Sequence, residues 1–162
     1  PRHEKMTVPG RTYFCHCMAR GTIGIALSHL SMLQDALDSG YETVWIMEDD
    51  ISVKRDPRLI SDYIEKLDKL VGKNGWDMLF MDQDEIDNAT GNYAVCLSYA
   101  PRPDFSPVSP GRFATRVNIS KDFRKIGARY GLYSFIIRRS GMRKILNFVK
   151  KYITAVCFFV IR

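Results

Sequence analysis

The sequence predicts an α/β fold in which a mostly parallel, Rossmann-type sheet is flanked by helices. Segments with helical apolar periodicity alternate with short apolar segments rich in β-branched and aromatic residues, and this order is typical of a largely parallel sheet. The chain of 162 residues is 46% hydrophobic and 26% charged, which is enough to bury the core of one globular domain. We therefore expect a single domain over residues 1–162.

The first helix is predicted from Thr22, where apolar side chains begin to recur at helical spacing. Ser39 and Gly40 provide a stop. Residues 43–47 follow, and their continuous apolar, β-rich sequence is typical of a strand buried on both faces. The apolar positions of the helix, which fall on one face, are Ile23, Ala26, Leu27, Leu30, Leu33 and Leu37.

A second helix and strand come next in the chain. Asp56 supplies an N-cap, and Pro57 suits the first helical position. Apolar positions carry this helix to Gly72. Residues 76–81 then form a second apolar strand that ends on Asp82, which completes two helix–strand pairs in the rhythm of an α/β layer.

The rest of the chain is less regular. Residues 83–128 are rich in Pro, Ser and Asn, with a short strand expected at 93–97 and a proline-rich loop at 100–111. Loops of this length in a compact domain often serve as lids or binding elements. A strand is predicted at residues 132–137, followed by a helix that begins at Ser140-Gly141.

The charge and cysteine content limit the classes of partner that we expect. The net charge is +6, from 24 Lys and Arg against 18 Asp and Glu. It favours nucleic acid, anionic lipid or a phosphorylated small molecule without choosing among them. Cys15, His16 and Cys17 have no second pair at finger-like spacing, so zinc is not expected. The apolar run at residues 153–161 is too short to span a bilayer.

Three acidic residues directly follow the first predicted strand. Side chains on a strand alternate, so Glu48 and Asp50 should share a face that Asp49 does not. Mg²⁺ and Mn²⁺ prefer oxygen ligands and leave positions open for phosphates. Open α/β sheets also bind ligands beyond the carboxyl ends of their strands. The three acids therefore indicate half of a cation site, with a solvated turn that caps the strand as the alternative.

Two linked motifs in the first third of the chain resemble glycosyltransferase family 25. Residues 21–30 are similar to the family's Gly-x-x-Gly-x-x-x-Ser-His helix, and residues 44–50 are similar to its strand ending in Glu-Asp-Asp. This family includes lipopolysaccharide and lipooligosaccharide glycosyltransferases and the procollagen galactosyltransferases. The glycines and the Ser-His pair of the helix motif are Gly21, Gly24, Ser28 and His29.

Two later stretches resemble the same family. Residues 76–81 are similar to its apolar strand after the acidic motif. Residues 131–141 are similar to a Gly-x-Tyr-x-Tyr-Ile-Ile-Ser-Arg-x-Gly segment, with Phe135 for the usual Tyr and Arg138 for the Ser. The ordered set, from about residue 21 to residue 146, is more specific than any single motif.

The resemblance implies a function and a setting. It implies a GT-A-like fold and a metal-dependent, inverting transfer from a UDP-sugar, with galactose the expected sugar and Mn²⁺ or Mg²⁺ the expected cation. The acceptor would be a glycan or a lipopolysaccharide. A cytoplasmic enzyme of lipopolysaccharide biosynthesis, with peripheral contact to the inner face of a bacterial membrane, is expected. Collagen-type acceptors in the endoplasmic reticulum are the alternative, and nucleic acid is not an expected partner.

The resemblance also implies roles for individual residues. Glu48 and Asp50 are the expected metal ligands. Inversion in one displacement requires a general base near the acceptor hydroxyl. Asp82 is the candidate, Asp84 and Glu85 are competitors, and a turn or cap role is the alternative for all three. The residues expected to contact the donor are Gly21, Gly24, Ser28, His29 and Asp49.

Several of these residues have a second interpretation. Gly21 and Gly24 suit close approach of the backbone to the donor, but tight packing of helix on sheet explains them equally well. His29 also suits a hydrogen bond that supports the loop after Asp50. The basic residues considered for phosphate contact are Arg138, Arg139 and Arg143.

Two departures from the family pattern leave other functions open. The Ile-Asn-Leu-like opening strand and the Pro-x-Asp-type segment after the last helix are not found, so we expect a fold that is incomplete at both ends. A catalytically inactive glycosyltransferase-like fragment and a binding module with a basic surface are the alternatives. A metal-dependent phosphohydrolase is a weaker one, because a single acidic cluster does not define two metals.

Overall fold

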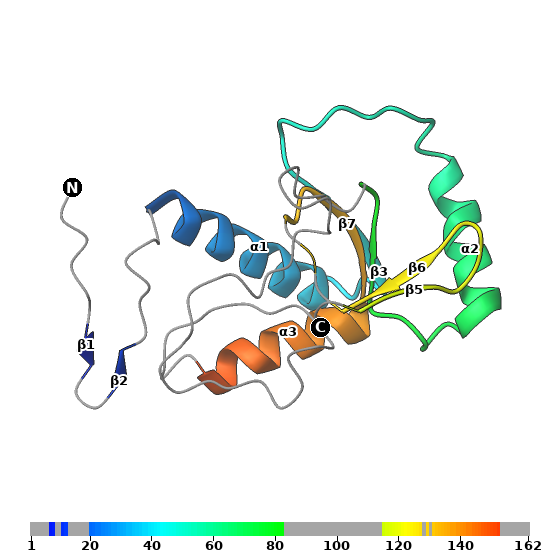
Figure 1. The fold of residues 1–162 in the computed structure, drawn as a ribbon. Helices are drawn as coiled ribbons and strands as arrows, with labels where there is room; N and C mark the ends of the chain where they lie inside the picture. Colours follow the sequence, from blue (N-terminus) through cyan, green and yellow to red (C-terminus); the bar gives the residue numbers. More distant parts are fainter. Residues whose placement is uncertain are drawn as a thin grey trace.

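A three-stranded sheet lies between two layers in the computed structural model of this chain (Figure 1). The residues described are 7–8, 11–12, 20–82, 115–127, 129 and 131–152. The elements are β1 (Thr7–Val8), β2 (Arg11–Thr12), α1 (Arg20–Asp38), β3 (Thr43–Met47), α2 (Leu59–Val71), β4 (Met78–Phe80), β5 (Arg116–Asn118), β6 (Arg124–Ile126), β7 (Ser134–Arg138) and α3 (Arg139–Tyr152).

The central sheet has the order β3-β7-β4, and both of its pairings are antiparallel. Thr43 pairs with Arg138 on one side of β7, and Met78 pairs with Ile137 on the other. Two further pairs, β1 with β2 and β5 with β6, are also antiparallel. The predicted GT-A-like, mostly parallel Rossmann-type sheet is therefore wrong for the strands that the structure describes.

The sequence did not show that β7 lies between β3 and β4. These two strands do run in the same direction, as the order helix, strand, helix, strand indicated, because each is antiparallel to β7. The predicted strand at residues 132–137 became β7, whose residues from Ser134 to Ile137 are all buried. Its middle position pairs both of its edges with β3 and β4. The elements packed on either side of the sheet bury its two faces.

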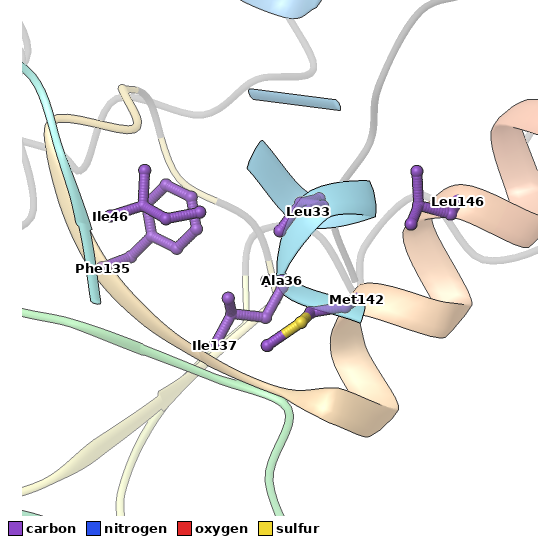
Figure 2. Close-up of a cluster of buried hydrophobic side chains, with 7 residues drawn as sticks. All are labelled: Leu33, Ala36, Ile46, Phe135, Ile137, Met142 and Leu146. Atoms are coloured by element: carbon purple, nitrogen blue, oxygen red, sulfur yellow. The ribbon is translucent and has the colours of Figure 1, made fainter. Parts of the chain in front are cut away.

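Helices α1 and α3 cover one face of the sheet and pack against each other (Figure 1). An added Cβ on Gly141 would lie 2.9 Å from the Asp77 carbonyl oxygen, so α3 begins in close contact with the start of β4. Figure 2 shows buried side chains from α1, β3, β7 and α3 that make up this cluster. They are Leu33, Ala36, Ile46, Phe135, Ile137, Met142 and Leu146.

The opposite face is covered by α2 and the β5–β6 hairpin. Leu67, Trp76 and Ile136 are buried there, and Phe123 of the hairpin packs edge-on against Tyr63 with ring centres 6.1 Å apart. The sequence did not predict the hairpin, because its strands have three residues each and are mostly polar. The strand expected at 93–97 and the loop expected at 100–111 lie outside the described residues.

The boundaries of α1 agree with the prediction, but its apolar face does not. The helix stops where Gly40 adopts a φ of 78°, a conformation that favours glycine. Leu33 is buried as expected, whereas Ile23 is exposed and Leu27 is 58% exposed. The first turns of α1 extend past the sheet (Figure 1). Helical periodicity alone did not show which part of the helix packs on the sheet.

Helix α2 begins later than predicted. The Arg58 N–H donates to Asp56 Oδ1 at 3.0 Å, and the Leu59 N–H donates to the Asp56 carbonyl oxygen at 3.1 Å. Asp56 and Pro57 therefore form a turn ahead of the helix, which starts at Leu59. At the other end, Gly72 has a φ of 83° and terminates α2 as expected.

An ion pair joins α2 to the central strand. Arg138 Nη2 donates to both carboxylate oxygens of Asp68 at 2.6 Å, and Trp76 Nε1 donates to Oδ1 at 2.7 Å. The guanidinium carbon of Arg138 lies 4.4 Å from the centre of the Trp76 ring. Burial alone would raise the pKa of the Asp68 carboxyl, but these hydrogen bonds, with the charges of Arg138 and Lys73, lower it below its ordinary value.

Replacing this carboxylate should destabilise the fold in a pH-dependent way. We expect Asp68→Asn to lower the free energy of unfolding by about 2–3 kcal/mol at neutral pH, because Arg138 loses its charged partner. A carboxyl whose folded-state pKa is lowered contributes stability above its unfolded pKa of about 3.9. That contribution disappears as the pH falls through the folded-state pKa, so urea unfolding should show the difference from wild type shrinking in acid.

Asp62→Asn is the matched control, because Asp62 lies on the same helix and is exposed. Its loss near the helix N-terminus should cost less than about 1 kcal/mol. Equal destabilisation by the two variants, or a loss for Asp68→Asn that stays constant in acid, would contradict the assigned role of the Asp68–Arg138 pair.

Candidate functional site

The carboxyl ends of β3 and β4 meet at one edge of the sheet, on either side of the start of β7. The Glu48 N–H donates to the Tyr133 carbonyl oxygen at 2.9 Å, and the Met81 N–H donates to the Ser134 carbonyl oxygen at 3.1 Å. The hydrogen-bond ladder thus continues one residue past each strand. Two of the predicted site residues, Glu48 and Asp82, are brought to this edge although the sheet is not parallel.

These two residues also share a face of the sheet. Ile46 and Phe80 each pair with Phe135, and side chains two residues further along a strand return to the same face. Glu48 and Asp82 therefore lie on the α1 side, with one strand between them. Two strand spacings of about 4.8 Å each separate their backbones by roughly 10 Å, which places the carboxylates at separate corners of one surface.

The other two acids of the triad lie beyond the strand. β3 ends at Met47, and Asp49 and Asp50 form an exposed turn, while Glu48 is partly buried. Strand alternation, which predicted a shared face for Glu48 and Asp50, therefore does not extend to Asp50. Within the described part of the chain, no three side chains of His, Cys, Asp or Glu are grouped so that they could hold a metal ion.

Asp82 is paired with a buried arginine. Arg129 Nη2 donates to Asp82 Oδ2, and Nη1 lies 3.4 Å from the Asp82 carbonyl oxygen. The guanidinium carbon is 4.6 Å from the centre of the Phe80 ring. Asp82 Oδ1 is buried and has no hydrogen-bond partner among the described residues. Asp84 and Glu85, the competing candidates for general base, lie outside the described residues.

His29 lies on α1 above the centre of the sheet. Its ring stacks on Phe135 with centres 5.9 Å apart and an angle of 18° between the planes. Nδ1 is 2.9 Å from the Ile25 carbonyl oxygen of its own helix, so this nitrogen carries the proton. Nε2 is buried and has no partner among the described residues. The predicted hydrogen bond to the loop after Asp50 is therefore not formed.

The remaining motif residues of α1 lie on an exposed side of the helix. Gly21, Gly24 and Ser28 share a face by their spacing, and all three are exposed. An added Cβ on either glycine would meet no described atom within 4 Å. Tight packing of helix on sheet, the alternative interpretation of the two glycines, therefore has no support in the described structure.

The three arginines considered for phosphate contact lie at the other end of the sheet from Glu48. Arg138 pairs in register with Thr43, at the start of β3, and binds Asp68. Arg139 donates to the carbonyl oxygens of Tyr41 and Leu37, near the C-terminal end of α1, a favourable place for a cation. Arg143 is exposed on α3. These positions do not favour phosphate contact at the acidic edge.

Arg129 is the residue of this surface that sequence reasoning missed. It was one basic residue among many in the last third of the chain, 47 positions from Asp82. No local pattern marks a basic side chain that will be buried against an acid so distant in sequence. The stacking of His29 on Phe135 was missed because these two residues are also far apart in the sequence.

No helix in the described ranges is both long enough and apolar enough to cross a membrane. A search of curated proteins and a search of solved structures each gave no match.

The family model described as "Glycosyltransferase family 25 (LPS biosynthesis protein)" matches residues 4–160, a longer stretch than the resemblance from 21 to 146. The ordered motifs on α1, β3, β4 and β7 all fall inside this match, and the chain therefore belongs to glycosyltransferase family 25.

Proposed function

We propose that this chain transfers a sugar, galactose by preference, from a UDP-sugar to a glycan or lipid-linked acceptor of lipopolysaccharide, with inversion at the anomeric carbon. The family match over residues 4–160 carries the proposal. The shared face of Glu48 and Asp82 supports it, because carboxylates at separate corners of one surface suit a donor site beside a base. We place the reaction at the cytoplasmic face of a bacterial membrane, with peripheral contact.

The acidic turn after β3 fits a hard divalent cation. Glu48 and Asp50 offer only carboxylate oxygens, which Mn²⁺ and Mg²⁺ accept. A cation bound through one or two carboxylates takes its other ligands from substrate phosphates and water, so a group of three protein ligands is not required. When bound, the cation would neutralise charge on the departing diphosphate.

The donor would lie against the first turns of α1. Gly21 and Gly24 leave an open, side-chain-free surface on the face that also carries Ser28. A helix-interior glycine is about 0.5–1 kcal/mol less stable than alanine, and the described structure shows no packing that requires it. Close approach of a ligand accounts for both glycines. Asp49, exposed beside the two metal ligands, and His29 complete the donor-contacting set.

Asp82 would act as the general base. Inversion by direct displacement needs a group that accepts the proton of the acceptor hydroxyl as that oxygen attacks. Asp82 Oδ1 is an acceptor without a described partner, at the same edge as the acidic turn. This carboxylate therefore meets the chemical requirement for a base, and it lies across one strand from Glu48.

Binding of UDP should require both the cation and the acidic turn. We expect calorimetric titration to detect UDP binding with Mn²⁺ and to lose it in EDTA, because the cation bridges carboxylate and diphosphate. Asp50→Ala should weaken binding by about tenfold or more, whereas Asp62→Ala on α2 should bind like wild type. Binding that is insensitive to EDTA, or equal in the two variants, would contradict a metal site at Glu48 and Asp50.

Replacing Gly24 should raise the stability of the fold and weaken the binding of UDP. Gly24→Ala should raise the free energy of unfolding by about 0.5–1 kcal/mol, because the methyl group meets open space and the helix gains propensity. The same methyl group should obstruct the donor and weaken UDP binding severalfold. Ser31→Ala, at an exposed position two turns along the same helix face, is the control. Unchanged UDP affinity in Gly24→Ala would place the donor elsewhere.

A further inference from the structure

Arg129 is a buried charge that contacts both Asp82 and the Phe80 ring. Its side chain is only 4% exposed, and removing a guanidinium from water costs several kcal/mol unless it is paired and hydrogen-bonded. Two hydrogen bonds of its guanidinium go to Asp82, one to the carboxylate and one to the backbone. Contact with the face of the Phe80 ring holds the guanidinium plane against β4.

This arrangement makes the two oxygens of Asp82 different. Oδ2 accepts from the guanidinium, while Oδ1 is buried without a partner among the described residues. A buried acceptor left without a donor costs about 1–3 kcal/mol, and such groups in native proteins often have a chemical role. Arg129 contacts both Oδ2 and the backbone carbonyl oxygen of Asp82, which restricts rotation of the Asp82 side chain. Arg129 therefore sets the direction of Oδ1.

We propose that Arg129 is a positioning residue that holds the Asp82 carboxylate in the orientation in which Oδ1 accepts the proton of the acceptor hydroxyl. The inference rests on the proposed function. In the transfer, the hydroxyl oxygen forms a bond to the anomeric carbon and its proton goes to Asp82 Oδ1. The bond between the anomeric carbon and the diphosphate oxygen breaks, and its electron pair leaves with UDP. Arg129 touches none of the reacting atoms and acts only through Asp82.

The competing explanation is that the Arg129–Asp82 pair only stabilises the fold. The two explanations differ for the double variant. Asp82→Asn alone removes the carboxylate that pairs with the buried guanidinium and should be destabilised. Adding Arg129→Met removes the guanidinium that lost this carboxylate, so stability should recover. Activity should recover with it if the pair is purely structural, and should stay low if Arg129 serves the base.

The experiment measures UDP release with water as the acceptor, in Mn²⁺, from UDP-galactose, UDP-glucose and UDP-N-acetylglucosamine. We expect Arg129→Met and Asp82→Asn each to lower kcat by about tenfold to a hundredfold, and the double variant to be no slower than Asp82→Asn. UDP affinity should be unchanged in all three. Arg129→Lys keeps the charge and should restore part of kcat. If Arg129→Met fails to fold, Arg129→Lys takes its place in the comparison of the single and double variants.

Arg139→Met is the matched control, because Arg139 is also a partly buried arginine but lies at the far end of the sheet. It should lower the melting temperature and leave kcat unchanged. The proposal is overturned if the rate effects multiply in the double variant, or if rate recovers together with stability. If UDP binds in the presence of Mn²⁺ but no donor releases UDP, the roles of Asp82 and Arg129 are overturned. If UDP does not bind at all, the proposed function itself is overturned.

Discussion

Burial of β7 on both faces is the constraint on which the rest of this structure depends. Its residues from Ser134 to Ile137 are at most 6% exposed, and a strand so apolar must be covered above, below and on both edges. β3 and β4 supply the edges, α1 and α3 cover one face, and α2 with the β5–β6 hairpin covers the other. The two hydrophobic clusters therefore lie on opposite faces of the sheet, and β7 contributes buried residues to both.

The same constraint creates the candidate site. Because β3 and β4 both run antiparallel to β7, their carboxyl ends arrive together at its first residues. A sheet whose neighbouring strands alternate in direction therefore still brings two strand ends to one edge, as a parallel sheet would. The acidic turn after β3 and Asp82 after β4 thus flank Tyr133, although 34 positions separate Glu48 from Asp82 in the sequence.

Two partly buried arginine–aspartate pairs, one on each face of the sheet, have different chemical character. Asp68, on α2, accepts hydrogen bonds on both oxygens, from Arg138 and Trp76, and joins α2 to β7. Asp82 accepts on one oxygen and keeps the other without a described partner, at the edge where strands end. A saturated carboxylate stabilises a fold, while a half-satisfied one retains the capacity to accept a proton.

The sequence by itself determined the local elements and the family. Apolar periodicity and the stops at Gly40 and Gly72 located α1, β3 and α2 to within a few residues, and ordered motifs identified glycosyltransferase family 25. These features depend on neighbours along the chain, which a sequence displays directly. Only the tertiary structure decided that β7 separates β3 from β4, that a polar hairpin joins α2 in covering the second face of the sheet, and that Arg129 holds Asp82. Each of those contacts joins residues distant in sequence, and is selected by burial and charge pairing in three dimensions, which local patterns do not encode.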